Sequence, residues 1–155
     1  MSDNLPININ ALNLSVEDRL LALGVLKKFL EVSTMDGDIL TNMVELESFI
    51  KTLPQAMDTI KIKEYVADGV VVREASALKG TLVSGRTHLK SEVGFLSKGS
   101  MITLTNYGIE FLTAPTTVIY PANIKRISYC ISDVVWSNIH STSDIPMNDT
   151  QLLGD

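Results

Sequence analysis

Three side chains with ligand or ion-pair chemistry stand close together between Gly80 and Gly99: Arg86, His88 and Glu92. If this segment forms strands, Arg86 and His88 point the same way, because alternate residues of a β-strand share a face. An imidazole and a carboxylate suit a first-row divalent metal, whereas a guanidinium stays protonated and attracts anions. The segment therefore carries groups that belong to two different kinds of site.

The spacing of these residues resembles the first sequence motif of the cupin family. Five residues separate Gly80 from Arg86, one separates Arg86 from His88, three separate His88 from Glu92, and six separate Glu92 from Gly99. Every interval agrees with the cupin motif. The difference is in one residue, since cupins have a histidine where Arg86 stands.

A second cupin motif is expected after an intervening pair of strands, and the segment from Pro115 to Arg126 has its intervals. Pro115 and Asn123 replace glycines of that motif, and Arg126 replaces its histidine. Asn123 keeps the turn chemistry, because asparagine tolerates a positive φ. The resemblance covers approximately residues 70–140 and implies a cupin barrel there.

In cupins the residues at positions 86, 88, 92 and 126 hold one divalent metal, but here two of the four are arginines. We therefore predict no bound cofactor, with a divalent metal on His88 and Glu92 as the less favoured alternative. Three interpretations are open: internal ion pairs, a pocket where Arg86 and Arg126 bind a carboxylate or phosphate, or a metal site completed by another residue such as His140. We favour the ion pairs, because buried charges are normally paired.

His140 itself has two interpretations. It closes the alternating segment from Trp136 to His140 and lies four residues after Trp136. It either faces the same cavity as Trp136 or merely ends the strand. We favour the strand end.

The elements that would position these residues are short strands. From residue 61 to 141, β-rich segments alternate with turn signals such as Asn106-Tyr107-Gly108 and Pro121. This pattern predicts a mainly β fold and, with the resemblance, a cupin-type β-barrel (a double-stranded β-helix, or jelly roll).

An α-helical hairpin is predicted ahead of the barrel. Ser15 and Asp38 are suitable N-cap residues for its two helices, and Pro54 ends the second helix. The hairpin packs either on its own barrel or in an oligomer interface, and both remain open. The predicted boundaries are an N-terminal arm over 1–14, the helical hairpin over 15–60, the barrel over 61–141 and a C-terminal tail over 142–155.

Composition narrows the choice of partners. A chain of 155 residues with net charge −5 and a pI near 5.0 lacks the positive charge expected for nucleic-acid binding. No apolar run approaches ~18 residues and no signal peptide opens the chain, so we expect no membrane partner. The single cysteine, Cys130, fits a reducing compartment and a buried, inert position.

The later half also resembles small cupin-like proteins encoded by tailed bacteriophages, through the segments Lys125-Arg126-Ile127-Ser128-Tyr129 and Val135-Trp136-Ser137-Asn138-Ile139-His140. The resemblance implies a phage origin and synthesis in the host cytoplasm, without supplying a reaction. We predict a non-enzymatic structural protein of the virion that forms homo-oligomers and contacts other virion proteins. The alternative is a small-molecule-binding or metal-dependent cupin that acts on an anionic substrate in the barrel.

Overall fold

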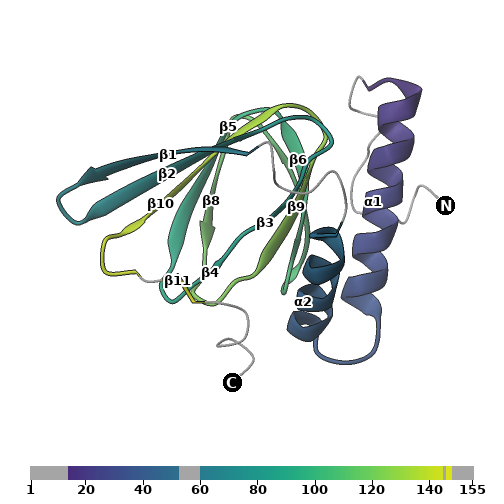
Figure 1. Cartoon of the computed structure of the whole chain (residues 1–155), viewed down its shortest axis with the longest axis horizontal. Coiled ribbons are helices and arrows are strands. Elements are labelled where there is room, and N and C mark those ends of the chain that lie inside the picture. The colour runs from purple at the N-terminus through teal and green to yellow at the C-terminus, as the bar shows by residue number, and fades with distance from the viewer. Residues whose placement is uncertain (1–13, 53–59, 145, 148–155) are drawn as a thin grey trace.

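The computed structural model describes residues 14–52, 60–144 and 146–147, and within them two helices precede a set of short strands (Figure 1). Their bounds are α1 Val16–Thr34, α2 Ile39–Ile50, β1 Lys61–Ala67, β2 Val70–Ala77, β3 Leu82–Ser84, β4 Thr87–His88, β5 Glu92–Lys98, β6 Ser100–Thr105, β7 Gly108–Thr113, β8 Thr116–Tyr120, β9 Arg126–Cys130, β10 Val134–Ser141 and β11 Pro146–Met147. Neither described helix is long and apolar enough to cross a membrane.

The strands form two main antiparallel sheets. The larger sheet has the order β1-β2-β10-β5-β8, and the smaller has the order β3-β9-β6-β7. One buried cluster joins them, with Leu96 and Trp136 from the larger sheet and Met101 and Cys130 from the smaller. The prediction of a mainly β, cupin-type barrel preceded by a helical hairpin is confirmed.

Both helices begin at the predicted caps. The Ser15 hydroxyl accepts a hydrogen bond from the Asp18 amide at 3.1 Å, and the Asp38 carboxylate accepts one from the Thr41 amide at 3.2 Å. Each cap satisfies a backbone donor that the first helical turn leaves without a partner.

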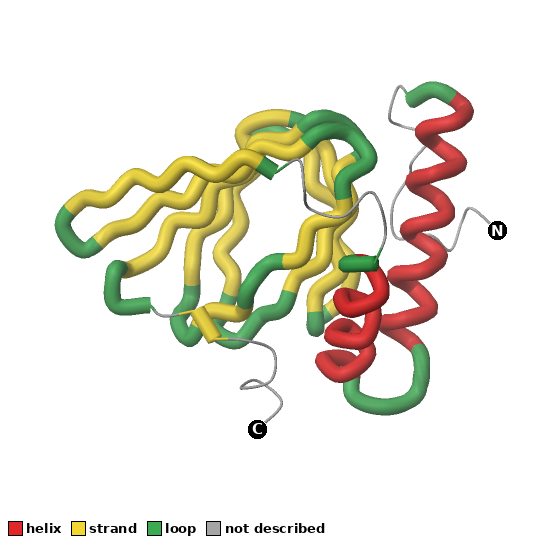
Figure 2. The backbone as a smooth tube through the Cα atoms, viewed as in Figure 1, coloured by secondary structure: helices red, strands yellow, loops and turns green. Residues whose placement is uncertain are grey.

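The hairpin covers the outer face of the smaller sheet (Figure 2). Leu26 and Phe29 of α1 pack in one buried cluster with Ile102, Leu104 and Ile127 of the sheet. The hairpin therefore packs on its own barrel, which is one of the two arrangements that the sequence left open. Its use in an oligomer interface remains a prediction.

A buried ion pair joins α2 to the barrel. The Lys125 ammonium lies 3.0 Å from a Glu47 carboxylate oxygen and donates to the Gly85 carbonyl at 3.1 Å. The other Glu47 oxygen accepts from the Ser84 hydroxyl. These contacts hold the segment before Arg86 against the second helix.

The first residues of the predicted tail lie against the barrel, because β11 pairs with β4 through Pro146 and His88. Asp144, just before β11, is buried. The predicted N-terminal arm, except for Leu14, and the end of the predicted tail from residue 148 lie outside the described residues.

Candidate metal and anion site

A cavity of about 490 Å³ lies between the two sheets. Its apolar wall includes Ile62, Val83 and Met101. Its polar lining includes Arg73, Arg86, His88, Arg126, Asn138 and His140. The cavity therefore combines an apolar wall with guanidinium and imidazole groups, as ligand-binding pockets commonly combine apolar and polar residues.

Strand alternation explains how β10 supplies this wall. Trp136, Asn138 and His140 are alternate residues of one strand, so they share its inner face. The Trp136 ring lies against Gly94 of β5, where a Cβ atom would overlap the ring. His140 thus faces the same cavity as Trp136, and the interpretation that it merely ends the strand is wrong.

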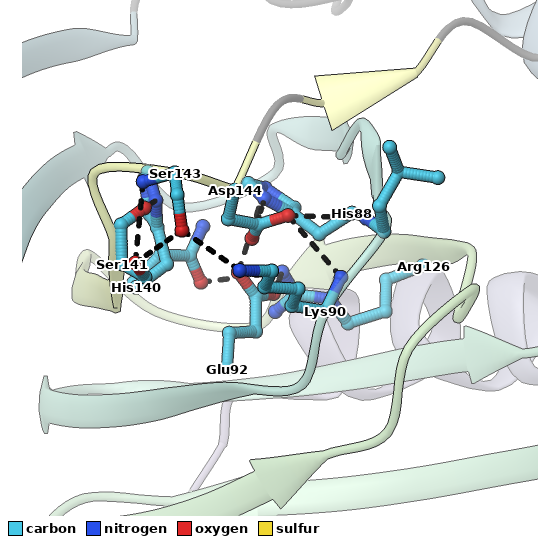
Figure 3. A network of polar contacts seen from close by, with 10 residues as sticks. His88, Lys90, Glu92, Arg126, His140, Ser141, Ser143 and Asp144 are labelled. Atoms are coloured by element: carbon cyan, nitrogen blue, oxygen red, sulfur yellow. Dashed lines mark hydrogen bonds and ion pairs between the residues drawn. The ribbon is translucent and has the colours of Figure 1, made fainter.

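Asp144 fixes the orientation of His88 (Figure 3). One Asp144 oxygen lies 2.8 Å from His88 Nδ1, and the other accepts hydrogen bonds from the Leu89 and Lys90 amides at 3.1 and 3.2 Å. From the opposite side, the Asn123 amide donates to the His88 carbonyl at 2.8 Å. Asn123 has φ 65°, as the turn interpretation predicted.

The second nitrogen of His88 faces Glu92. His88 Nε2 lies 3.4 Å from Glu92 Oε2, and this buried oxygen has no hydrogen-bond partner among the described residues. When Nδ1 donates its proton to Asp144, Nε2 offers a lone pair, so two acceptors face each other. A second proton on the ring, or a cation close by, would relieve this repulsion.

Arg126 neutralises Glu92 through one nitrogen of its guanidinium, Nη2. Its guanidinium lies 2.7 Å from Glu92 Oε1 and 3.2 Å from the Asn138 oxygen. It also stacks over Tyr120, with its central carbon 4.5 Å from the ring centroid. This is the internal ion pair that we favoured from the sequence, but it includes Arg126 and not Arg86.

Arg86 lies apart from that pair. It is exposed at the cavity lining and forms no ion pair or hydrogen bond with the described residues. The structure thus brings together His88, Glu92 and Arg126 of the four predicted site residues, and leaves Arg86 separate.

His88, His140 and Asp144 form a second constellation, named here the metal cluster. Their ligand atoms all lie within 4.8 Å of one another. His140 Nδ1 is 3.1 Å from the Ser141 carbonyl, so its Nε2 is left to bind a ligand. Two imidazoles and one carboxylate fit iron, manganese, nickel or zinc. The prediction that no cofactor binds is corrected by this cluster, which makes a metal site plausible.

The motifs missed this cluster for a clear reason. His140 and Asp144 lie outside both cupin motifs, and they reach His88 only because β10 and the chain after it return to β4. The sequence did offer His140 as a completing ligand, through its alternation with Trp136, but the strand-end interpretation was favoured. Asp144 had no comparable signal, because it stands in a polar segment without periodicity.

Burial sets the protonation of two groups near the cavity. Burial, with a hydrogen bond from the Tyr120 hydroxyl to Glu110 at 2.8 Å, raises the pKa of Tyr120 well above its usual range. Burial and the nearby Asp133 charge raise the pKa of Cys130 to about 12. Both side chains are therefore neutral at physiological pH, and the predicted burial of Cys130 is confirmed.

Solved structures similar to this chain include cupins. A cupin 2 domain-containing protein from Halorhodospira halophila has a TM-score of 0.50 at 13% identity, covering 63% of this chain and 78% of that one. An RmlC-like cupin from Shewanella frigidimarina has a TM-score of 0.49 at 16% identity, covering 56% and 79%. The chain therefore has the cupin fold that its motifs predicted.

A third similar structure is a salicylate 1,2-dioxygenase from Pseudaminobacter salicylatoxidans, with a TM-score of 0.49 at 16% identity. The match covers 66% of this chain but only 31% of that one, so this chain matches about a third of the dioxygenase. At these identities the likenesses concern the fold alone. No protein-family model and no curated protein matches the chain. The bacteriophage resemblance is not shown by these comparisons and stays a prediction.

Proposed function

We propose that this chain is a small-molecule-binding cupin that holds a divalent cation at the metal cluster and takes an anionic ligand in the barrel cavity. The observation that carries the proposal is the position of the cluster. Its two histidines line the cavity, and its carboxylate stands behind one of them. The alternative stated from the sequence is thus better supported than a virion role.

Buried charge also supports a cation at this place. Asp144 and Glu92 are 4% and 3% exposed, and Arg126, at 8%, is the buried cation paired with Glu92. Arg126 therefore pairs with Glu92 alone, Asp144 has no lysine or arginine partner among the described residues, and the His88 ring lies between the two carboxylates. A buried charge is costly unless it is neutralised. A divalent cation in the metal cluster would more than offset the one remaining negative charge.

The surrounding residues have separate roles in this proposal. Asp144 and the Ser141 carbonyl orient the two imidazoles, which favours one ring nitrogen of each for ligation. Arg126 pairs with Glu92 Oε1 and leaves Glu92 Oε2 facing His88 Nε2 at the edge of the metal cluster. A bound divalent cation would supply a Lewis-acid centre that attracts the acidic group of a ligand.

Metal titration tests the proposal. Tag-free protein is titrated with Mn²⁺, Ni²⁺ and Zn²⁺ by calorimetry, and bound metal is counted by elemental analysis. We expect one equivalent, and we expect His140→Ala and Asp144→Asn each to weaken binding about 100-fold.

Asp68→Asn is the matched control, because Asp68 is an exposed carboxylate in the turn between β1 and β2. It should bind metal as the native chain does. The proposal is wrong if the native chain binds less than one equivalent, or if His140→Ala and Asp144→Asn both keep native affinity while thermal unfolding shows them folded.

A second candidate function is the structural role in a phage particle. The exposed apolar side chains Val16, Leu20 and Leu21 on α1 favour a protein interface. Light scattering of the purified chain, with mass spectrometry of particles, tests this role. A monomer that is absent from particles would remove it.

A further inference from the structure

Two arginines in the cavity have no partner among the described residues. Arg73 and Arg86 both line the cavity, and neither forms an ion pair, a hydrogen bond or a ring contact there. Arg126 differs, because it is committed to Glu92 and to the Tyr120 ring. The two remaining guanidiniums are therefore the cavity's available anion-binding groups.

Arg73 lies on β2 next to the metal cluster. Arg73 is opposite Asn138 in the sheet register, and Val71 is opposite His140. Arg73 and His140 are thus diagonal neighbours on one face, with Cα atoms about 7–8 Å apart. Glu64 of β1 is opposite Arg73 on its other side, but the two form no ion pair.

Arg86 approaches from a different element. It stands two residues before His88, between β3 and β4, and it lines the same cavity. The rings of His88 and His140 are 5.0 Å apart, centroid to centroid. The two imidazoles therefore lie together, and each has an arginine near it in the chain or in the sheet: Arg86 two residues before His88, and Arg73 diagonal to His140.

We infer that the ligand of this cavity is a small dicarboxylate whose two acidic groups are anchored by Arg73 and Arg86. This inference rests on the proposed function, in which an anionic ligand enters the cavity. A guanidinium matches a carboxylate with two parallel charge-assisted hydrogen bonds. Two guanidiniums on separate elements set the distance between the two acidic groups, so chain length becomes the basis of selectivity.

Calorimetric titration with defined probes tests the inference. Succinate, glutarate and adipate are compared with butyrate, valerate and hexanoate, with inorganic phosphate as a separate probe. The native chain should bind one of the dicarboxylates at least about 10-fold more tightly than its monocarboxylate counterpart. Arg73→Gln and Arg86→Gln should each remove about 10-fold of that affinity, and the double variant should remove the preference.

Lys63→Gln is the matched control for charge. Lys63 lies on β1, one residue from the inward-facing Glu64, so it points to the outer face of the sheet. It should keep the dicarboxylate preference, and all the arginine variants should keep native metal binding. The inference is overturned if Lys63→Gln weakens dicarboxylate binding as much as Arg73→Gln does, or if phosphate binds more tightly than every dicarboxylate.

Two results separate this inference from the proposed function. Every titration is run with and without Mn²⁺. Metal binding without any dicarboxylate preference would overturn the inference and leave the metal proposal standing. A dicarboxylate preference that depends on the two arginines, in a chain that binds no metal, would overturn the metal proposal and leave the inference standing.

Discussion

His88 is held between two carboxylates, and this arrangement limits what the imidazole can do. Asp144 accepts from one side at 2.8 Å, and Glu92 lies 3.4 Å from the other nitrogen. The ring cannot turn without losing the Asp144 contact. A fixed ring with one nitrogen already engaged suits a ligand of a metal ion better than a group that shuttles protons.

Cys130 provides a prediction at the same scale, because it borders the cavity yet is fully buried. Its pKa of about 12 leaves almost no thiolate at pH 8, and the thiolate is the reactive form. We expect iodoacetamide to label the native chain at least about 100-fold more slowly than the chain unfolded in guanidinium chloride, measured by intact mass.

The raised pKa of Cys130 also makes the stability of the fold depend on pH. Folding raises the pKa of the Cys130 thiol from 9.0 to about 12. The contribution of this thiol to the free energy of unfolding is therefore complete below pH 9.0, and it is lost as the pH rises toward 12. Fast native-state labelling at pH 8 would contradict the burial of this thiol.

At the scale of elements, Glu47 and Lys125 couple α2 to the barrel. Lys125 is 1% exposed, and its partner oxygen on Glu47 is 3.0 Å away. Removing one member of a buried pair costs about 3–5 kcal/mol, because the other charge is left without its partner. We expect Glu47→Ala to lower the free energy of unfolding by about that amount, measured by urea denaturation.

Glu45→Ala is the control on the same helix, since Glu45 is exposed. It should change the free energy of unfolding by about 0.5 kcal/mol or less. Replacing both partners, as Glu47→Leu with Lys125→Met, should cost less than Glu47→Ala alone. Equal effects of Glu47→Ala and Glu45→Ala would show that the ion pair does not anchor the helix.

Element positions were largely predictable, because they depend on local signals. The caps Ser15 and Asp38 start both helices where the sequence predicted, and Asn123 adopts the positive φ that its turn requires. The β-rich segments correspond to strands, since alternation and turn residues act over a few positions. The contact between Asp144 and His88 was not predictable in this way, because the two residues are far apart in the sequence and meet only after the chain has folded.

At the scale of the whole molecule, the helices and the cavity occupy different sides of the smaller sheet. The hairpin covers its outer face (Figures 1 and 2). The residues that line the cavity lie on its inner face. Binding in the cavity can therefore occur without displacement of the hairpin. The metal cluster joins β4, β10 and Asp144, which lies two residues before β11, so a cation there would tie the end of the described chain to the barrel.

Metal binding should for this reason stabilise the folded chain. A ligand that binds only the folded state, at 100 times its dissociation constant, adds about 2.7 kcal/mol to the free energy of unfolding. For a chain of this size, that corresponds to a rise in Tm of about 5–10 °C. We expect Mn²⁺ to produce this rise in the native chain and in Arg73→Gln, measured by scanning calorimetry. Asp144→Asn and His140→Ala should show little or none of it. An equal rise in Asp144→Asn would place the bound Mn²⁺ elsewhere, and no rise in the native chain at saturating Mn²⁺ would mean that the cation does not bind the folded state preferentially.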